Sequence, residues 1–377
     1  MNLTNVNHLS PHREIEEAVL FILLRSGLWE READDLSLFP LSGSGWERVY
    51  RLARQHTVAG IVFEGVCRLP DELMPPESLL VRWVAEADRI ERDSRRMNEA
   101  VEGNLAFWAG QGLNPVLLKG QGIARMYASP LLREAGDIDL YFPDRAQRRC
   151  ADDLARAKGL RPQKMPDGST TYRWEGIEVE HHPALFDLHT PSLKKYLCAL
   201  ERRYGFVAQP AGTPGGLDIV VPSPVLNLLL LNAHILKHAL GKGIGLRQLC
   251  DMARACAALR GYVDGGELKE IYRRVGISRW SRLLHSFLVS ELGLPADCLP
   301  YPETLVSAAP LSAIVLAGGN FGQFRGVGAD STPQPAQGGK LRTAFSFLQN
   351  LRFSFRYAPG EAFWMVATLL KGQFKCS

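Results

Sequence analysis

The sequence lacks the features that mark several classes of protein. Its seven cysteines are irregularly spaced and form no Cys-x-x-Cys pair, which argues against a disulfide scaffold and favours reduced thiols in a cytoplasmic protein. The formal net charge of +4 over 377 residues is too small to indicate nucleic-acid binding by itself. No internal repeat is visible, and the polar first residues have no signal-peptide pattern, so we expect a cytoplasmic location.

Long hydrophobic runs are also missing. The longest, residues 225–236, is about half as long as a membrane span and contains two Asn and one His. It therefore predicts a buried helix, and we expect no membrane insertion. Hydrophobic residues nevertheless make up 46% of the chain and charged residues 22%. That balance is typical of a globular protein with a large core, and it excludes disorder of the chain as a whole.

Hydrophobic periodicity divides the chain into four regions. They are a helical N-terminal region (1–95), a mixed α/β core (96–221), a helical domain (222–319), and a Gly/Pro-rich loop followed by a C-terminal helical segment (320–377). The helical patterns within them cover 13–27, 46–66, 77–109, 224–240, 246–260, 266–275 and 278–291. We therefore expect an α+β fold, in which a small mixed sheet lies between helical regions.

The most informative stretch is the predicted strand over 137–142, which begins Asp-Ile-Asp. Residues i and i+2 of a strand point to the same face, so Asp137 and Asp139 project together, roughly 7 Å apart. Two buried carboxylates at that spacing repel each other unless a cation lies between them. Mg²⁺ suits this arrangement, because it prefers oxygen ligands and binds one or two carboxylates plus substrate phosphates. A lone Asp-x-Asp is also common at solvated strand edges. The neighbouring residues therefore have to distinguish a metal site from an exposed pair of aspartates.

The segment before this strand is suited to phosphate. A predicted strand over 115–120 ends in Lys119 and Gly120 and leads into a short helix. Glycine lets a phosphate approach the backbone closely, and a helix start offers free N–H groups. Lys119 and Arg133 supply positive charge that can neutralise phosphate.

The segment after it offers a third acid. A hairpin predicted over 170–182 alternates Glu178, Glu180 and His182 on one face. The order of strands and helices can bring this face beside the aspartate pair, and Glu180 is the candidate that completes a carboxylate triad.

Other polar groups have simpler explanations. His234 and His238 lie four residues apart on one helix face, a metal-binding spacing, but the Glu of a His-Glu-x-x-His motif is missing. We favour interior or cleft-facing histidines over a zinc site, and a contribution of this pair to the substrate cleft stays open. Arg247 and Asp251 have the same spacing and predict an ion pair on the helix surface or between domains.

The order of these residues resembles the DNA polymerase β-like nucleotidyltransferase superfamily, and within it an uncharacterised family of bacterial nucleotidyltransferases. The similarity covers about residues 40–260 and rests on Leu118-Lys119-Gly120, Arg133, Asp137-Ile138-Asp139-Leu140 and Val179-Glu180-His181-His182. It implies that Asp137, Asp139 and Glu180 are catalytic and bind metal. It also implies that Lys119, Gly120, Gln121 and Arg133 bind the nucleotide, although Gln121 stands where the wider superfamily has a phosphate-holding Ser. His182, His234 and His238 are candidates for the cleft.

The expected reaction is transfer of a nucleoside monophosphate from an NTP to a hydroxyl acceptor, with one or two Mg²⁺ ions. The acceptor could be a small molecule, a sugar, a protein or an RNA end. Long nucleic acid is disfavoured, because no basic stripe with interleaved aromatics is present. Two alternatives stay open. One is a non-catalytic binding protein with an eroded core, which Gln121 and Glu180 suggest, and the other is a phosphotransferase that moves only the γ-phosphate.

Overall fold

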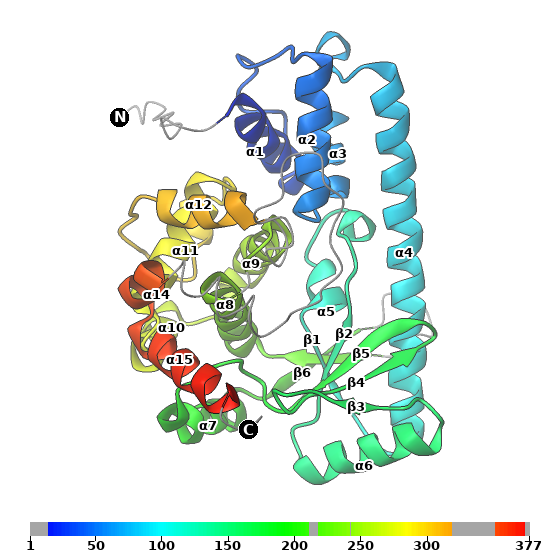
Figure 1. The fold of residues 1–377 in the computed structure, drawn as a ribbon, viewed down its shortest axis with the longest axis vertical. Helices are drawn as coiled ribbons and strands as arrows, with labels where there is room; N and C mark the ends of the chain where they lie inside the picture. Colours follow the sequence, from blue (N-terminus) through cyan, green and yellow to red (C-terminus); the bar gives the residue numbers. More distant parts are fainter. Residues whose placement is uncertain (1–13, 211–217, 242, 319–350, 374–377) are drawn as a thin grey trace.

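The computed structural model describes residues 14–210, 218–241, 243–318 and 351–373. Figure 1 shows the first helices of the chain at one end of the molecule, a mixed β-sheet toward the other end, and the C-terminal helices beside both. A long helix, α4, runs along one side from the N-terminal helices to the sheet (Figure 1). The fold is α+β with a small sheet between helical regions, as the sequence predicts.

Four helices form the N-terminal part: α1 (Ile15–Leu28), α2 (Gly43–Gln55), α3 (Ala59–Val66) and α4 (Glu77–Gly110). The prediction of a single helix over 46–66 is wrong, because α2 ends at Gln55 and α3 begins at Ala59. Thr57 has a φ of 54° there, a left-handed conformation that interrupts a right-handed helix. The side chain of Glu134 then accepts a hydrogen bond from the Ala59 amide at the start of α3, at 3.1 Å.

Helix α4 contributes to two hydrophobic cores. Its first half packs Leu79 and Trp83 among the helices, and its second half packs Val101 and Trp108 against the sheet. The buried positions recur every three or four residues, the spacing of one helix face. The region boundary predicted between residues 95 and 96 therefore falls inside a continuous helix.

The main sheet has five strands in the order β1-β2-β5-β4-β3. The strands are β1 (Val116–Leu118), β2 (Ile138–Tyr141), β3 (Gln163–Lys164), β4 (Thr170–Trp174) and β5 (Ile177–His182). Only the central pair, β2 and β5, is parallel, and every other pairing in this sheet is antiparallel. The register of the parallel pair sets Asp139 beside Glu180. A second sheet pairs β6 (Phe206–Gln209) with β7 (Ile219–Pro222).

Short helices follow the strands of the core: α5 (Gly120–Ala124), α6 (Arg145–Ala157) and α7 (Lys194–Tyr204). Asp144 caps α6, because its side chain accepts a hydrogen bond from the Ala146 amide at 2.7 Å. Single 3₁₀ turns lie at Asp71–Leu73, Pro130–Leu132, Pro191–Leu193, Arg260–Tyr262 and Ala296–Cys298.

The C-terminal part is helical, as predicted. Its helices are α8 (Pro224–Leu240), α9 (Leu246–Leu259), α10 (Gly265–Val275), α11 (Ser278–Ser290), α12 (Ala309–Gly318), α14 (Leu351–Tyr357) and α15 (Pro359–Gln373). The apolar run over 225–236 forms most of α8 and is almost wholly buried. Among the described helices, none combines the length and the apolar character needed to cross a membrane. Most of the Gly/Pro-rich stretch predicted from residue 320 lies outside the described residues.

Candidate active site

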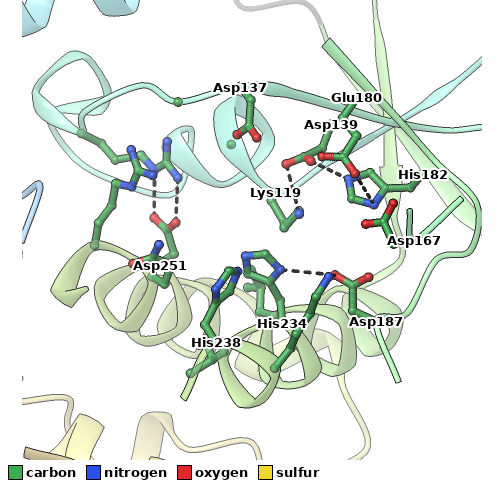
Figure 2. A pocket seen from close by; sticks show the side chains of 18 residues that line it. Lys119, Asp137, Asp139, Asp167, Glu180, His182, Asp187, His234, His238 and Asp251 are labelled. Atoms are coloured by element: carbon green, nitrogen blue, oxygen red, sulfur yellow. Dashed lines mark hydrogen bonds and ion pairs between the residues drawn. The ribbon is translucent and has the colours of Figure 1, made fainter. Parts of the chain in front are cut away.

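The acidic residues gather on one face of the two parallel strands (Figure 2). Asp139 lies in β2 and Glu180 lies beside it in β5, while His182 follows two residues later and therefore shares the face of Glu180. The imidazole Nε2 of His182 is 2.6 Å from Asp139 Oδ1, and its Nδ1 is 3.8 Å from Glu180 Oε1. One ligand atom from each of these three residues lies within 4.8 Å of the other two. Asp137 directly precedes β2 and points to the same side (Figure 2).

Lys119 holds the other oxygen of Asp139. Its Nζ lies 3.2 Å from Asp139 Oδ2, and the two side chains are only 10% and 6% exposed. Lys119 itself has a φ of 51°, and Gly120 follows with a φ of 41°. These two left-handed residues turn the chain sharply from β1 into α5, which a glycine permits at the second position without a steric penalty. The turn is what aims the lysine at the carboxylates.

Charge compensation keeps Asp139 ionised. Burial alone would raise the pKa of its carboxyl, but Lys119 and His182 together hold that pKa below its usual range. Burial and Lys119 oppose protonation of His182, yet Asp139 and Glu180 outweigh them and raise the pKa of the imidazole. The charge of Asp139, followed by loss of hydration, raises the pKa of Asp137. The resting site is therefore an ionised carboxylate held between Lys119 and His182, with a second carboxyl that accepts a proton more readily.

Helix α8 supplies the opposite wall (Figure 2). The rings of His234 and His238 meet edge to face with centroids 4.5 Å apart. Asp187 lies between them and the acidic cluster, with Lys237 Nζ at 3.1 Å and His234 Nδ1 at 3.6 Å from its Oδ2. Burial and the charge of Lys119 lower the pKa of His234 to about 4, and burial with the neighbouring His234 also lowers the pKa of His238. Both imidazoles are thus neutral near pH 7.

Arg133 makes a buried ion pair with Asp251 of α9. Its Nε donates to Asp251 Oδ1 at 2.9 Å and its Nη2 donates to Oδ2 at 2.7 Å, with both side chains 5% exposed. This pair uses the planar fork that would otherwise bind a phosphate. The predicted Arg247–Asp251 ion pair is wrong. Arg247 Nη1 donates instead to the backbone carbonyls of Glu134 and Ala135, at 2.9 and 3.2 Å.

These groups surround a polar cavity of about 200 Å³. All of the site residues predicted from the sequence line it except Gln121. The Gln121 side chain donates instead to Asn98 Oδ1 at 2.5 Å. The lining that the sequence did not reveal includes Asp167, Asp187 and Lys237. Lys237 had a usable signal, since it lies three residues after His234 on the same helix face, whereas the two aspartates lie in loops without periodicity.

A mixed sheet with Asp-x-Asp at the start of one strand, an acid on the parallel neighbouring strand and a lysine directed at them is the type of site expected in a nucleotidyltransferase. Residues 42–289 match the family described as "Uncharacterised nucleotidyltransferase". The match spans more than half of the chain, and the chain therefore belongs to this family.

Other comparisons are weaker. No curated protein matches the chain at a significant level. A crystal structure of an antigenic nucleotidyltransferase-like protein from Paracoccidioides brasiliensis is similar with a TM-score of 0.33 and 13% sequence identity, covering 57% of this chain and 97% of that one. At so low a score no residue role is transferred from it.

Proposed function

We propose that the protein transfers a nucleoside monophosphate from a nucleoside triphosphate to a hydroxyl acceptor, assisted by a divalent metal. The observation that carries this proposal is that Asp137, Asp139 and Glu180, brought together by two parallel strands, face one polar cavity. Membership of the nucleotidyltransferase family supports it. Membership of the DNA polymerase β-like superfamily, and of its uncharacterised bacterial branch, belongs to the same proposal.

The donor groups fit a divalent cation. Asp139, Glu180 and His182 bring two carboxylates and an imidazole within 4.8 Å of one another. Carboxylate oxygens suit Mg²⁺, and the imidazole extends the choice to Mn²⁺ or Zn²⁺. Asp137 offers a further carboxylate beside this group. We assign one or two Mg²⁺ ions to Asp137, Asp139 and Glu180; when bound, they supply neutralisation of the phosphates and stabilise the departing pyrophosphate.

The chain's own groups then bind and orient the substrates. The Lys119 ammonium lies beside Asp139 and would bind a phosphate oxygen, while Gly120 leaves the backbone open for close approach. Arg133 would reach a phosphate only after releasing Asp251, so we place its contribution in holding the cavity wall.

In the transfer, the acceptor oxygen forms a bond to the α-phosphorus as the bond from that phosphorus to the bridging oxygen breaks. Pyrophosphate leaves, and we assign the acceptor's proton to Glu180. The neutral imidazoles of His234 and His238 lie across the cavity, where they can hydrogen-bond the acceptor without adding charge.

Titration calorimetry tests the nucleotide site. The wild type is titrated with non-hydrolysable analogues of the four NTPs, with and without Mg²⁺, and the titrations are repeated on Asp137→Asn and Asp139→Asn. Asp153→Asn is the matched control, because Asp153 is an exposed α6 residue outside the cavity lining. We expect Mg²⁺-dependent binding that both site variants lose and the control keeps. Equal binding by all four proteins would refute the assignment of the site.

One alternative has support of its own. Lys119 and His182 already balance the charge of Asp139, so the site can persist without a metal. A catalytically eroded protein that binds nucleotide for regulation predicts binding that is indifferent to Mg²⁺ in the same titration. Product analysis with labelled ATP then separates the two catalytic options. Pyrophosphate release supports nucleotidyl transfer, and ADP release supports a phosphotransferase.

The cysteines bear on where the protein works. All six described cysteines are free of disulfides, and three of them are buried. A reducing compartment suits this arrangement. We therefore retain the cytoplasm as the proposed location, with the NTP and the acceptor as the expected partners.

A further inference from the structure

A second and larger hollow lies next to the catalytic cavity. It has a volume of about 950 Å³ and runs between α6, α7 and the segment 183–188 that follows β5. Its apolar lining includes Phe142, Leu185, Leu188 and Leu197. We call it the α6–α7 groove. In Figure 1 both helices lie at the same end of the molecule, away from α1–α3.

The rim of the α6–α7 groove is strongly basic. Three arginines of α6 and two basic residues of α7 line it: Arg145, Arg148, Arg149, Lys194 and Arg202. None of the five makes an ion pair with another described residue, and no described atom hydrogen-bonds the buried Nε of Arg148. The two acids of the lining are already engaged, because Asp144 caps α6 and Glu201 accepts from the Tyr141 hydroxyl at 2.9 Å. The groove therefore has five uncommitted cations.

The groove and the catalytic cavity share a wall. Along the segment 183–188, Phe186 and Leu188 line the groove, while Asp187 between them lines the cavity. The same alternation occurs where β5 ends, since His182 faces the cavity and Pro183 faces the groove. A ligand extended along the groove is therefore separated from the carboxylates by this one segment of chain.

We propose that the α6–α7 groove binds an acidic polypeptide segment with apolar side chains, and that this segment is the hydroxyl acceptor; the second half of this statement rests on the proposed function. Glu or Asp side chains would pair with the basic rim while Leu or similar side chains fill the apolar lining. A Ser, Thr or Tyr next to the docked stretch would then reach past the edge of the shared wall and present its hydroxyl to the cavity.

The lining favours a peptide over a nucleic acid. Single-stranded nucleic acids bind through aromatic rings on which the bases stack. The aromatic side chains of the groove, Tyr141, Phe142 and Phe186, are all at least nine-tenths buried, and the Tyr141 hydroxyl is tied to Glu201. Aliphatic side chains and prolines form the accessible floor instead, and these suit apolar side chains of a peptide.

Fluorescence anisotropy tests the groove directly. The probe is a short fluorescein-labelled peptide in which Glu alternates with Leu around a single Ser, titrated with the full chain. The test variant is Arg148→Glu with Lys194→Glu, which reverses one charge on each wall. The matched control is Lys195→Glu with Arg279→Glu, which reverses two exposed charges outside the groove. Circular dichroism and thermal unfolding establish that both variants fold.

We expect saturable binding that weakens with salt, falls about tenfold or more in the groove variant, and is kept by the control. Replacing Leu by Ser in the peptide should weaken binding as well. The proposal is overturned if the wild type does not bind the peptide or if the groove variant binds it equally. It is also overturned if a labelled oligouridine alone shows the charge-dependent loss, or if light scattering finds a dimer that dissociates only in the groove variant.

The calorimetric titration with NTP analogues keeps the two proposals apart. The groove variant should bind Mg²⁺ and nucleotide like the wild type, because neither substituted residue lines the cavity. A wild type that binds nucleotide but not the peptide counts against the groove alone. Normal peptide binding without nucleotide binding counts against the transferase.

Discussion

Removal of the Asp251 carboxylate would leave Arg133 as an uncompensated charge inside the protein. The two side chains form two parallel hydrogen bonds, and each is 5% exposed. The Tyr127 hydroxyl also donates to Asp251 Oδ1, at 2.8 Å, and would lose its acceptor. Breaking one partner of such a buried pair costs about 3–5 kcal/mol. We therefore expect Asp251→Ala to lower the free energy of unfolding by about that amount.

A double variant separates the lost pair from the exposed charge. Arg133→Met combined with Asp251→Leu removes both charges and keeps apolar volume, a replacement that is commonly neutral or mildly stabilising elsewhere. We expect the double variant to be more stable than Asp251→Ala. It should remain less stable than the wild type by about 1–3 kcal/mol, because the Tyr127 hydroxyl still lacks its acceptor.

Urea unfolding followed by tryptophan fluorescence measures both variants. A loss below about 1 kcal/mol in Asp251→Ala would place the pair among weak surface ion pairs and refute the reasoning. So would a double variant that is less stable than the single one. Nucleotide binding gives a second readout: if Arg133 served mainly to bind phosphate, Arg133→Met would abolish nucleotide binding while leaving the unfolding midpoint nearly unchanged.

Three further changes test other parts of the fold. Burial lowers the pKa of His285 to about 4, whereas the pKa of an exposed histidine in the unfolded state is about 6.5. As the pH falls, the unfolded state therefore binds the proton first. The free energy of unfolding is highest above pH 6.5 and declines toward pH 4, by about 2 kcal/mol at pH 5. Between neutral pH and pH 5, the free energy of unfolding in denaturant should therefore fall by about 2 kcal/mol less in His285→Phe than in the wild type. An equal fall in both proteins would contradict this. Gly65→Ala should cost about 1–3 kcal/mol in thermal unfolding, because its methyl group would overlap the backbone of Leu23 in α1, whereas Gly110→Ala meets nothing and should be neutral or stabilising. Glu361 accepts hydrogen bonds from the amides of His189 and Thr190 at 2.6 and 3.1 Å, so Glu361→Ala should release α15 and cost about 1.5–3 kcal/mol; limited proteolysis that cleaves near α15 no faster than in the wild type would refute this.

The acidic cluster could be predicted from the sequence because it depends on local periodicity. Alternation along a strand fixes which residues share a face, so Asp139 followed from Asp137, and His182 from Glu180. The remaining step, that the two strands pair, is confirmed by a register that sets Asp139 beside Glu180. The helices of the C-terminal part were predictable for the same reason, since their apolar spacing is regular.

The partners of the charged groups could not be predicted in the same way. Arg133 and Asp251 are 118 residues apart, and their contact depends on how α9 packs against the turn before β2. From the sequence, a nearby Arg247 was the natural partner for Asp251 and a phosphate was the natural partner for Arg133. Tertiary packing pairs Asp251 with Arg133 instead of Arg247, because a buried arginine requires a carboxylate within reach. The phosphate-binding role of Arg133 stays a prediction. The interruption between α2 and α3 at Thr57 could not be predicted either, because apolar spacing does not determine the backbone conformation of a single residue.

Asp139 has a role in the resting fold and a second role in the proposed function, and both use the same carboxylate oxygens. In the resting protein its two oxygens are held by His182 at 2.6 Å and Lys119 at 3.2 Å, which is how a buried carboxylate stays charged. The proposed metal would need those same oxygens, so binding is an exchange of cations rather than a simple addition of one. Lys119 would then be released beside the phosphates at the moment when their charge must be neutralised. On this reasoning, Lys119→Met should weaken both the resting fold and nucleotide binding, whereas a lysine with a purely structural role would affect only the fold.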